Sequence, residues 1–256
     1  MKIHVLTLFP EMFTPVTEAS ILGRAGEKGI LDINLINIRD YSNDKHSRAD
    51  DTPFGGGVGM VMLADPIFGA LRSIVPGAPD EEIKKKKILY MSPRGRHLDQ
   101  KMIEEMACVD EIVILCGHYE GVDQRVLDYW EMEEVSIGDY ILTGGELPAM
   151  VLIDAVSRFI PGVLGTKESA TDESIYSGLL ECDQYTKPRE YAGMMVPEVL
   201  FGGNHRLIYL WQLENALRRT RDCRPDLLEK WLSQERKLKK DEKKILDKIL
   251  SPEQLP

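Results

Sequence analysis

Cysteine is scarce in this chain, with four residues among 256: Cys108, Cys116, Cys182 and Cys223. No two of them form a Cys-x-x-Cys pair, and no histidine lies at ligand spacing from any two of them. The pattern therefore suggests neither a disulfide framework nor a zinc site. We expect all four to be reduced residues of the core.

Long apolar runs are absent as well. The longest, such as Ile112–Cys116 and Met150–Val156, fall far short of the roughly 20 residues that a membrane-spanning helix needs. The apolar start Ile3–Phe9 has neither the length nor the cleavage pattern of a secretory signal. These absences predict a cytoplasmic protein without a membrane partner. The length suits one large domain or two modest ones.

Positive charge is in deficit overall, because the formal net charge is −10 at pH 7. The deficit is uneven: residues 200–256 hold more Lys and Arg than Asp and Glu, whereas the rest of the chain is strongly acidic. Such asymmetry indicates a nucleic-acid-binding module on an acidic body. Lys alternates with Glu and Asp in Lys230–Lys248, however, and this alternation also fits a solvated helix face.

Strands and helices are expected to alternate through the first part of the chain. Apolar runs rich in β-branched residues predict strands at Ile3–Phe9, Leu31–Ile38, Lys87–Met91, Glu111–Cys116 and Glu134–Ile137. Apolar residues three or four apart predict a helix of about 15 residues ending at Gly26 and Gly29, and others at Leu98–Met106, Val122–Trp130 and Glu146–Phe159. This order predicts an α/β fold with a mostly parallel sheet covered on both faces.

A different pattern begins after Pro161–Tyr176, where Gly, Thr, Ser, Asp and Glu dominate and no apolar period survives. We interpret this segment as a linker. Beyond it, helical spacing recurs at Leu207–Arg219, Pro225–Leu232 and Leu238–Leu250. The chain is thus expected to comprise a first domain at 1–161, a linker at 162–176 and a small, mainly helical domain at 177–256.

Ligand sites of parallel sheets lie beyond the carboxyl ends of the strands. Two segments there, Gly117–Asp123 and Ser136–Pro148, are rich in glycine and carry acidic side chains. They match neither the phosphate loop nor the dinucleotide fingerprint, and they suit a neutral or cationic ligand such as a nucleoside without phosphate. The glycine-rich segment Asp50–Met60 also lacks the residues that a phosphate loop needs. The alternative is that these glycines only form tight turns.

Several segments together resemble one family, the bacterial tRNA (guanine-N1-)-methyltransferases of the TrmD type. The resemblance is carried by Leu8–Phe13, Thr52–Met60, Leu115–Asp123, Ser136–Met150 and Ser157–Gly165, in an order that needs no large gaps. It implies a SPOUT-type domain whose chain forms a deep trefoil knot, S-adenosyl-L-methionine bound at the knot, and a homodimer with an active site shared between subunits. The implied product is 1-methylguanosine at position 37 of tRNA, next to the anticodon. The family also suggests an assisting Mg²⁺, which the sequence leaves open, and no protein ligands for a metal are assigned.

The resemblance also implies roles for single residues. It assigns cofactor contacts to Tyr90, Met91, Ser92, Pro93, Gly117, Glu120, Ile137, Gly138, Asp139, Tyr140, Ile141, Leu142, Gly144, Gly145 and Pro148. Met91 and Leu142 are also compatible with core positions at strand ends. For the guanine and the RNA backbone, the candidates are Arg24, Asp50, Glu181, Asn204 and His205.

Methylation of guanine N1 requires removal of its proton and stabilisation of the charge that develops on O6. Arg158 matches the catalytic arginine of the family. The general base of the family is an Asp in the linker, where this sequence has Glu173, preceded by Asp172. Either carboxylate can accept a proton, and both are also compatible with solvated linker residues.

Three other functions remain to be compared with this hypothesis. One is a SPOUT-type RNA methyltransferase acting on a different base or on a 2′-hydroxyl. The second is an RNA-binding module with a vestigial cofactor site, and the third is a dinucleotide-dependent oxidoreductase.

Overall fold

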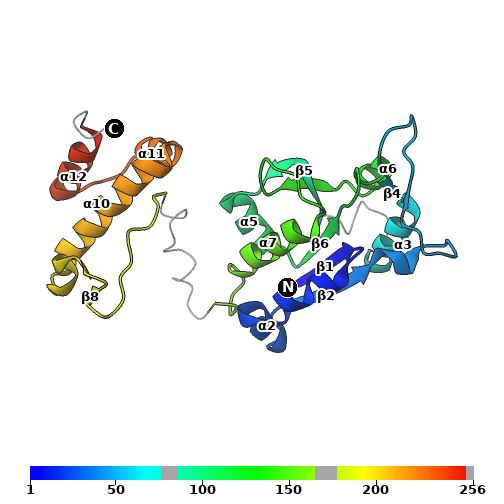
Figure 1. The fold of residues 1–256 in the computed structure, drawn as a ribbon, viewed down its shortest axis with the longest axis horizontal. Coiled ribbons are helices and arrows are strands. Elements are labelled where there is room, and N and C mark those ends of the chain that lie inside the picture. The colour runs from blue at the N-terminus through cyan, green and yellow to red at the C-terminus, as the bar shows by residue number, and fades with distance from the viewer. Residues whose placement is uncertain (76–85, 165–177, 252–256) are drawn as a thin grey trace. The chain divides into compact units, whose positions relative to one another are not determined.

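The computed structural model describes residues 1–75, 86–164 and 178–251 of the chain. They divide into two compact units, which the contacts place at Met1–Ala170 and Thr171–Pro256 (Figure 1). The division falls at residue 170, inside the segment predicted as a linker. In the described ranges, no helix has the length and apolar character needed to cross a membrane.

The first unit alternates strands and helices. Its strands are β1 (Lys2–Thr7), β2 (Asp32–Asn37), β3 (Asp50–Asp51), β4 (Val61–Met62), β5 (Lys86–His97), β6 (Glu111–Cys116) and β7 (Glu133–Ser136). Its α-helices are α1 (Thr14–Thr17), α2 (Ser20–Glu27), α3 (Ala64–Ile74), α5 (Gln100–Ala107), α6 (Gln124–Tyr129) and α7 (Glu146–Ser157), with short 3₁₀ helices at Pro10–Met12 and Ile38–Tyr41.

Five of these strands form one sheet in the order β2-β1-β6-β5-β7, and every neighbouring pair is parallel. This confirms the predicted parallel sheet. The central strand β6 pairs Ile114 with Val5 of β1 and with Leu89 of β5. Because a central parallel strand is buried on both faces, a continuous apolar run is what such a strand requires.

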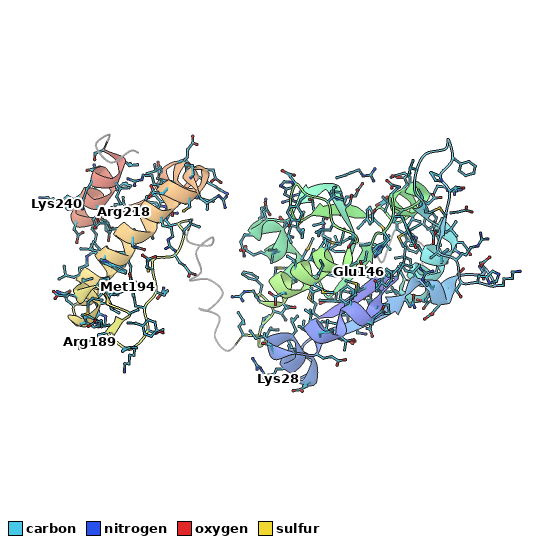
Figure 2. All side chains as sticks on the ribbon, in the orientation of Figure 1. Lys28, Glu146, Arg189, Met194, Arg218 and Lys240 are labelled. Atoms are coloured by element: carbon cyan, nitrogen blue, oxygen red, sulfur yellow. The ribbon has the colours of Figure 1, made fainter. Side chains whose placement is uncertain are left out.

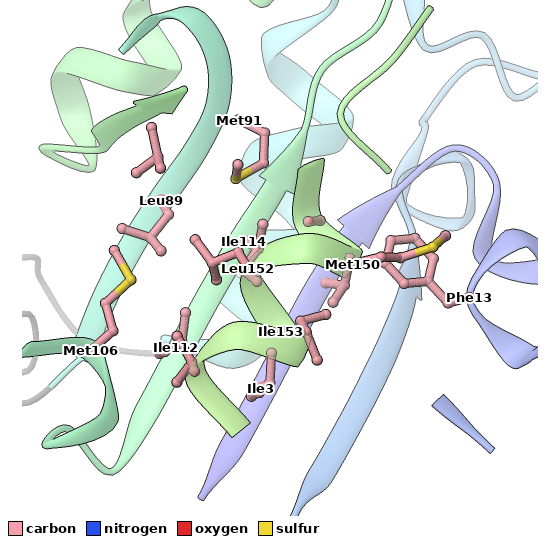
Figure 3. Packing of buried hydrophobic residues seen from close by; sticks show 14 of the residues in the cluster. Ile3, Phe13, Leu89, Met91, Met106, Ile112, Ile114, Met150, Leu152 and Ile153 are labelled. Atoms are coloured by element: carbon pink, nitrogen blue, oxygen red, sulfur yellow. The ribbon is translucent and has the colours of Figure 1, made fainter. Parts of the chain in front are cut away.

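Two hydrophobic cores cover the two faces of the sheet. Alternate residues of β6 enter different cores: Ile112 and Ile114 belong to the first, and Val113 and Leu115 to the second. In the first core, Leu152 and Ile153 of α7 lie over Ile112, Ile114 and Ile3 of the sheet (Figure 3). The second core is closed by α3 and α6. Each fully buried Leu or Ile contributes about 1.5–3 kcal/mol, so these cores fix the strand ends on which the loops stand.

The structure differs from the sequence prediction at several elements. The first predicted helix is divided into α1 and α2: the chain is extended at Ala19, and Ser20, the first residue of α2, has a φ of +52°. Helix α3 was not predicted at all. Strand β5 continues beyond the predicted Lys87–Met91 to His97, and its register against β7 shifts between Met91 and Arg96.

The expectation about the cysteines was wrong for three of the four. Only Cys116 is buried, at the end of β6. Cys108 and Cys223 are exposed, and Cys182 is half-buried. Burial, with a smaller contribution from the Glu146 carboxylate, raises the pKa of the Cys116 thiol well above its usual range, so this thiol stays protonated and unreactive.

The second unit contains three helices at the positions that the spacing predicted. They are α10 (His205–Cys223), α11 (Pro225–Leu232) and α12 (Lys240–Leu250), preceded by a short hairpin of β8 (Glu190–Tyr191) and β9 (Met194–Met195) and a 3₁₀ helix at Glu198–Phe201. Leu217 of α10 and Ile249 of α12 are fully buried in their common core. Arg206 at the start of α10 binds Asp241 at 2.5 Å and Glu242 at 2.9 Å, which ties α10 to α12.

Candidate functional site

A cavity of about 340 Å³ lies where the carboxyl ends of β6 and β7 meet the irregular part of β5. Its walls come from three segments: Tyr90–Arg94, Gly117–Val122 and the chain from Val135 to Pro148. The structure thus brings together residues that lie far apart in the sequence. All of the predicted cofactor residues line this cavity except Asp139.

Asp139 lies outside this lining. Its side chain is 87% exposed, and its Oδ1 lies 2.8 Å from Nε2 of His97. Met91, for which a core position was the alternative, is 4% exposed and belongs to the first core, yet it also lines the cavity. Leu142 is 38% exposed and is therefore not a core residue.

Two glycines bring the cavity segments into close contact. A Cβ on Gly117 would lie 2.7 Å from the ring of Tyr90, and one on Gly145 would lie 2.7 Å from Cα of Cys116. The Gly145 N–H donates to the Gly117 carbonyl oxygen at 2.8 Å. These glycines are therefore required by packing between segments, which a tight turn alone would not demand.

Hydroxyl groups and one carboxylate, that of Glu120, give the lining of the cavity its polarity. Ser92 and Ser136 are buried, and the Ser136 hydroxyl donates to the Gly138 carbonyl oxygen at 3.1 Å. Burial raises the pKa of the Tyr90 phenol, so it stays a neutral donor at physiological pH. Arg94 is the one basic side chain among the lining residues besides His118, and it is paired with Glu134 at 3.2 Å. A phosphate group would thus meet Glu120 and no free cation in this lining.

Glu120 and Tyr119, in the loop after β6, connect the cavity to β3 and to the loop that follows it. The Glu120 N–H donates to the Met60 carbonyl oxygen at 2.9 Å, and a Cβ on Gly59 would lie 2.5 Å from Oε1 of Glu120. Tyr119 has a φ of +59°, and its phenol is hydrogen-bonded to Asp50. Burial and then this carboxylate raise the pKa of Tyr119. Asp50, a predicted substrate residue, therefore lies beside the cavity.

A second, neighbouring cavity of about 300 Å³ shares its wall with the first. Both are lined by His118, Thr143 and Gly144, and the second is completed by Glu146 with the apolar residues Phe9, Met12 and Leu147. Glu146 is 2% exposed and starts α7 within the first unit (Figure 2). Sequence reasoning missed His118, Tyr119, Thr143 and Glu146. All four lie in the glycine-rich segments that it did select, but only their spatial neighbours distinguish them.

Of the predicted catalytic residues, Arg158 is described by the structure and does not line the cavity. Arg158 is half-buried at the carboxyl end of α7, about 18 Å along the helix axis from Glu146 at its start. Asp172 and Glu173 lie outside the described residues.

The remaining substrate candidates are dispersed. Arg24 is exposed on α2 of the first unit, and Glu181 is exposed before the hairpin of the second. Asn204 is the N-cap of α10, because its side-chain oxygen accepts from the N–H groups of Arg206 and Leu207 at 3.1 and 3.3 Å. His205 is exposed in the first turn of that helix. In residues 1–75, 86–164 and 178–251, no three His, Cys, Asp or Glu side chains are placed to hold a metal ion.

The chain is similar in sequence to known proteins over most of its length. The sequence model of the tRNA (guanine-1)-methyltransferase TrmD family matches residues 1–230. The chain belongs to this family. The tRNA (guanine-N(1)-)-methyltransferase of Ruminiclostridium cellulolyticum is 54% identical over 230 residues, which cover 90% of this chain and 97% of that protein. The enzyme of the same name from Alkaliphilus oremlandii is 50% identical over 252 residues, covering 98% and 99% of the two chains. The one from Geobacillus kaustophilus is 49% identical over 231 residues, covering 90% and 93%.

Membership in the TrmD family confirms the resemblance found in the sequence segments. The match extends through both units and ends within α11.

Proposed function

We propose that this protein transfers a methyl group from S-adenosyl-L-methionine to N1 of guanine at position 37 of tRNA. The observation that carries the proposal is the single cavity lined by all but one of the residues that the TrmD resemblance assigned to the cofactor. Family membership over residues 1–230 supports the reaction class.

The lining fits such a donor. The segments that meet at Gly117 and Gly145 leave backbone groups accessible at close range, as an adenine and an amino-acid end require. Glu120 suits a positive charge, and no phosphate site is present among the described lining residues. When bound, S-adenosyl-L-methionine supplies an electrophilic methyl group on a sulfonium. A dinucleotide cofactor would need phosphate donors that this lining does not offer.

The reaction requires residues of the chain to accept the N1 proton and to stabilise the charge that develops on O6. We assign the general base to Glu173, with Asp172 as the alternative: the carboxylate takes the N1 proton while the new N–C bond forms and the S–C bond breaks. Arg158 is assigned to O6, where its guanidinium offsets the developing negative charge. Asp50 and Tyr119, which are hydrogen-bonded to each other, are assigned to contacts with the guanine.

A homodimer with shared active sites is part of the proposal. Within one chain, Arg158 is about 18 Å from the start of α7, so the arginine and the cavity of the same chain are separated. Apolar side chains are exposed on α1 and α7 and in the loop before α7: Val16 by 37%, Leu147 by 50%, Val151 by 48% and Ile141 by 79%. A second copy covering them would supply the missing catalytic groups. The SPOUT class and a deep trefoil knot around the cavity belong to the same proposal.

The second unit is assigned to tRNA binding. Arg189, Met194, Arg218 and Lys240 lie on its outside (Figure 2), and Tyr191 of the hairpin is 74% exposed. Cations beside exposed aromatic and apolar side chains are typical of surfaces that hold phosphates and unstacked bases. The exposed lysines of α12 serve the same purpose here, rather than only solvating a helix face.

The test is to incubate the full chain with labelled S-adenosyl-L-methionine and unmodified tRNA and to map the methylated nucleotide. Label at N1 of guanine 37 is expected. Label on a 2′-hydroxyl or on another base would replace the proposal by the alternative SPOUT-type reaction. Binding of tRNA without any transfer would favour an RNA-binding module.

A further inference from the structure

A buried polar chain links three segments at the edge of the cavity. The Thr7 hydroxyl, at the end of β1, donates to Oε1 of Glu146 at 2.6 Å. Oε2 of Glu146 lies 2.7 Å from Nε2 of His118, in the loop after β6. Thr7 is 0% exposed, Glu146 2%, and the His118 side chain 14%. A carboxylate this deeply buried is rare unless it is paired, and here each of its oxygens has one partner.

The direction of each contact follows from the groups. The Thr7 hydroxyl accepts the Phe9 N–H at 2.9 Å, so its own hydrogen is available for Glu146. An ionised Glu146 carboxylate can only accept, and it pairs with the form of His118 that carries a hydrogen on Nε2. The ring is further held by Phe9, with centroids 5.0 Å apart, and the His118 N–H points to the Met62 sulfur at 3.2 Å.

The backbone of the cavity loop rests on this pair. A Cβ on Gly144 would lie 2.4 Å from Cε1 of His118 and 2.6 Å from Oε2 of Glu146, so Gly144 is in direct contact with both side chains. Gly144 and His118 line the cavity, whereas Thr7 lines neither cavity and Glu146 lines only the second. The first cavity therefore takes its shape partly from groups that do not reach it.

We propose that Glu146 is a positioning residue: its carboxylate, held by Thr7 and His118, fixes the loop at Thr143–Gly145 against the loop at Gly117–Gly121 and so sets the width of the cofactor cavity. This inference rests on the proposed function, since it takes the cavity to be the site of S-adenosyl-L-methionine. Its effect is on cofactor affinity, because Arg158 lies about 18 Å from Glu146 along the axis of α7 and Glu173 belongs to another segment.

Thr7 offers the sharpest test, because it touches the carboxylate and not the cavity. Thr7→Val preserves the shape and removes the hydroxyl, whereas Thr7→Ser retains the hydroxyl. Calorimetry on the full chain should show that Thr7→Val weakens S-adenosyl-L-methionine binding by about 5-fold or more and that Thr7→Ser stays within about 2-fold of the wild type. In steady-state assays the KM for the cofactor should rise while kcat at saturating cofactor changes by less than about 2-fold.

A second matched pair varies only the reach of the partner. The amide nitrogen of His118→Gln can occupy the place of Nε2, whereas that of His118→Asn is one methylene short. Weak cofactor binding is expected for Asn, with substantial recovery for Gln. His4→Gln serves as the control. His4 lies on the same strand as Thr7 and 3.2 Å from Glu111, and its side chain is 14% exposed, like that of His118. It should leave cofactor affinity unchanged.

The outcomes separate the two proposals. A wild-type chain that does not bind S-adenosyl-L-methionine overturns the proposed function. A wild type that binds, together with Thr7→Val and His118→Asn variants that bind equally well, overturns the positioning role. Equal losses in Thr7→Val and Thr7→Ser also overturn it, because the hydroxyl would then be irrelevant. If Thr7→Val fails to unfold cooperatively in a thermal scan, the His118 pair decides.

Discussion

Alanine at position 145 tests how closely α7 must approach the end of β6. Gly145 has a φ of −82° and a ψ of −5°, which alanine adopts without strain, so any effect must come from the added methyl group. That methyl group would lie 2.7 Å from Cα of Cys116 and 2.8 Å from the Gly117 nitrogen, both backbone atoms that cannot rotate away.

The magnitude follows from this overlap. Restoring an ordinary contact of about 3.5–4 Å requires the start of α7 to move by roughly 1 Å, which also stretches the 2.8 Å hydrogen bond from Gly145 to Gly117. Overpacking of this kind costs about 1–3 kcal/mol of stability. A shift of about 1 Å in a positioned site can lower activity by roughly 100-fold.

The control is the same substitution in α2. A Cβ on Gly26 would have no atom within 4 Å, so Gly26→Ala should stabilise the first unit by about 0.4–1 kcal/mol. In urea unfolding, the free energy of unfolding should therefore be highest for Gly26→Ala, intermediate for the wild type and lowest for Gly145→Ala. Calorimetry should show weakened S-adenosyl-L-methionine binding for Gly145→Ala alone. A Gly145→Ala protein with wild-type stability and affinity would refute the close approach of α7 to β6.

Four further outcomes are expected. Burial lowers the pKa of His4, and Glu111 offsets this only in part, so the folded chain binds fewer protons than the unfolded chain below pH 6.5. The free energy of unfolding is therefore highest above pH 6.5, where His4 is neutral in both states, and it falls as the pH drops through the lowered pKa of His4. Urea unfolding at about pH 7.5 and 5.5 should show a smaller pH dependence for His4→Gln than for the wild type. Leu217→Ala should lower the stability of the second unit by about 2–5 kcal/mol while calorimetry finds cofactor binding intact, and a parallel loss of cofactor binding would mean that the units are coupled. Glu173→Gln should lower turnover by about 10²–10⁴-fold with cofactor affinity unchanged and Asp172→Asn nearly silent; the reverse result would move the general base to Asp172. Finally, tRNA affinity should fall steeply with added KCl, whereas a flat profile would contradict phosphate contacts by the second unit.

The parts of the fold that the sequence predicts well are those with one local cause. Strand β6 was predicted with its observed bounds because Ile112–Cys116 is a short apolar run rich in β-branched residues, which is typical of a doubly buried strand. Helix α11 begins at Pro225, a residue that favours the first turn, and was likewise predicted with its observed bounds.

The parts that it missed have non-local causes. The irregularity of β5 around Gly95 is set by β7, since a Cβ on Gly95 would lie 2.3 Å from the Glu134 carbonyl carbon. No pattern within Ser92–Arg96 contains that information. Three cysteines were misplaced for a similar reason: residue type favours burial, but position on the surface of a helix or loop decides it.

The site was predictable to the level of segments and not of side chains. Glycine-rich, acid-bearing loops after β6 and β7 were selected for a ligand without phosphate, and they do meet in one cavity. The pairing of Glu146 with His118 could not be foreseen, because 28 residues separate them and neither is unusual in its own segment.

The uneven charge of the chain fits a division of labour between the units. In the proposed reaction, the phosphates of the tRNA are repelled by the acidic first unit and attracted by residues 200–256 of the second, which hold more Lys and Arg than Asp and Glu. In the same proposal, the group that enters the first unit is a neutral base, which an acidic surrounding does not repel. At its destination an acidic environment is useful, because both the cationic donor and the proton released from N1 are stabilised by nearby carboxylates. A net charge of −10 is therefore compatible with a tRNA-modifying enzyme, provided that the positive charge is concentrated where the phosphates lie.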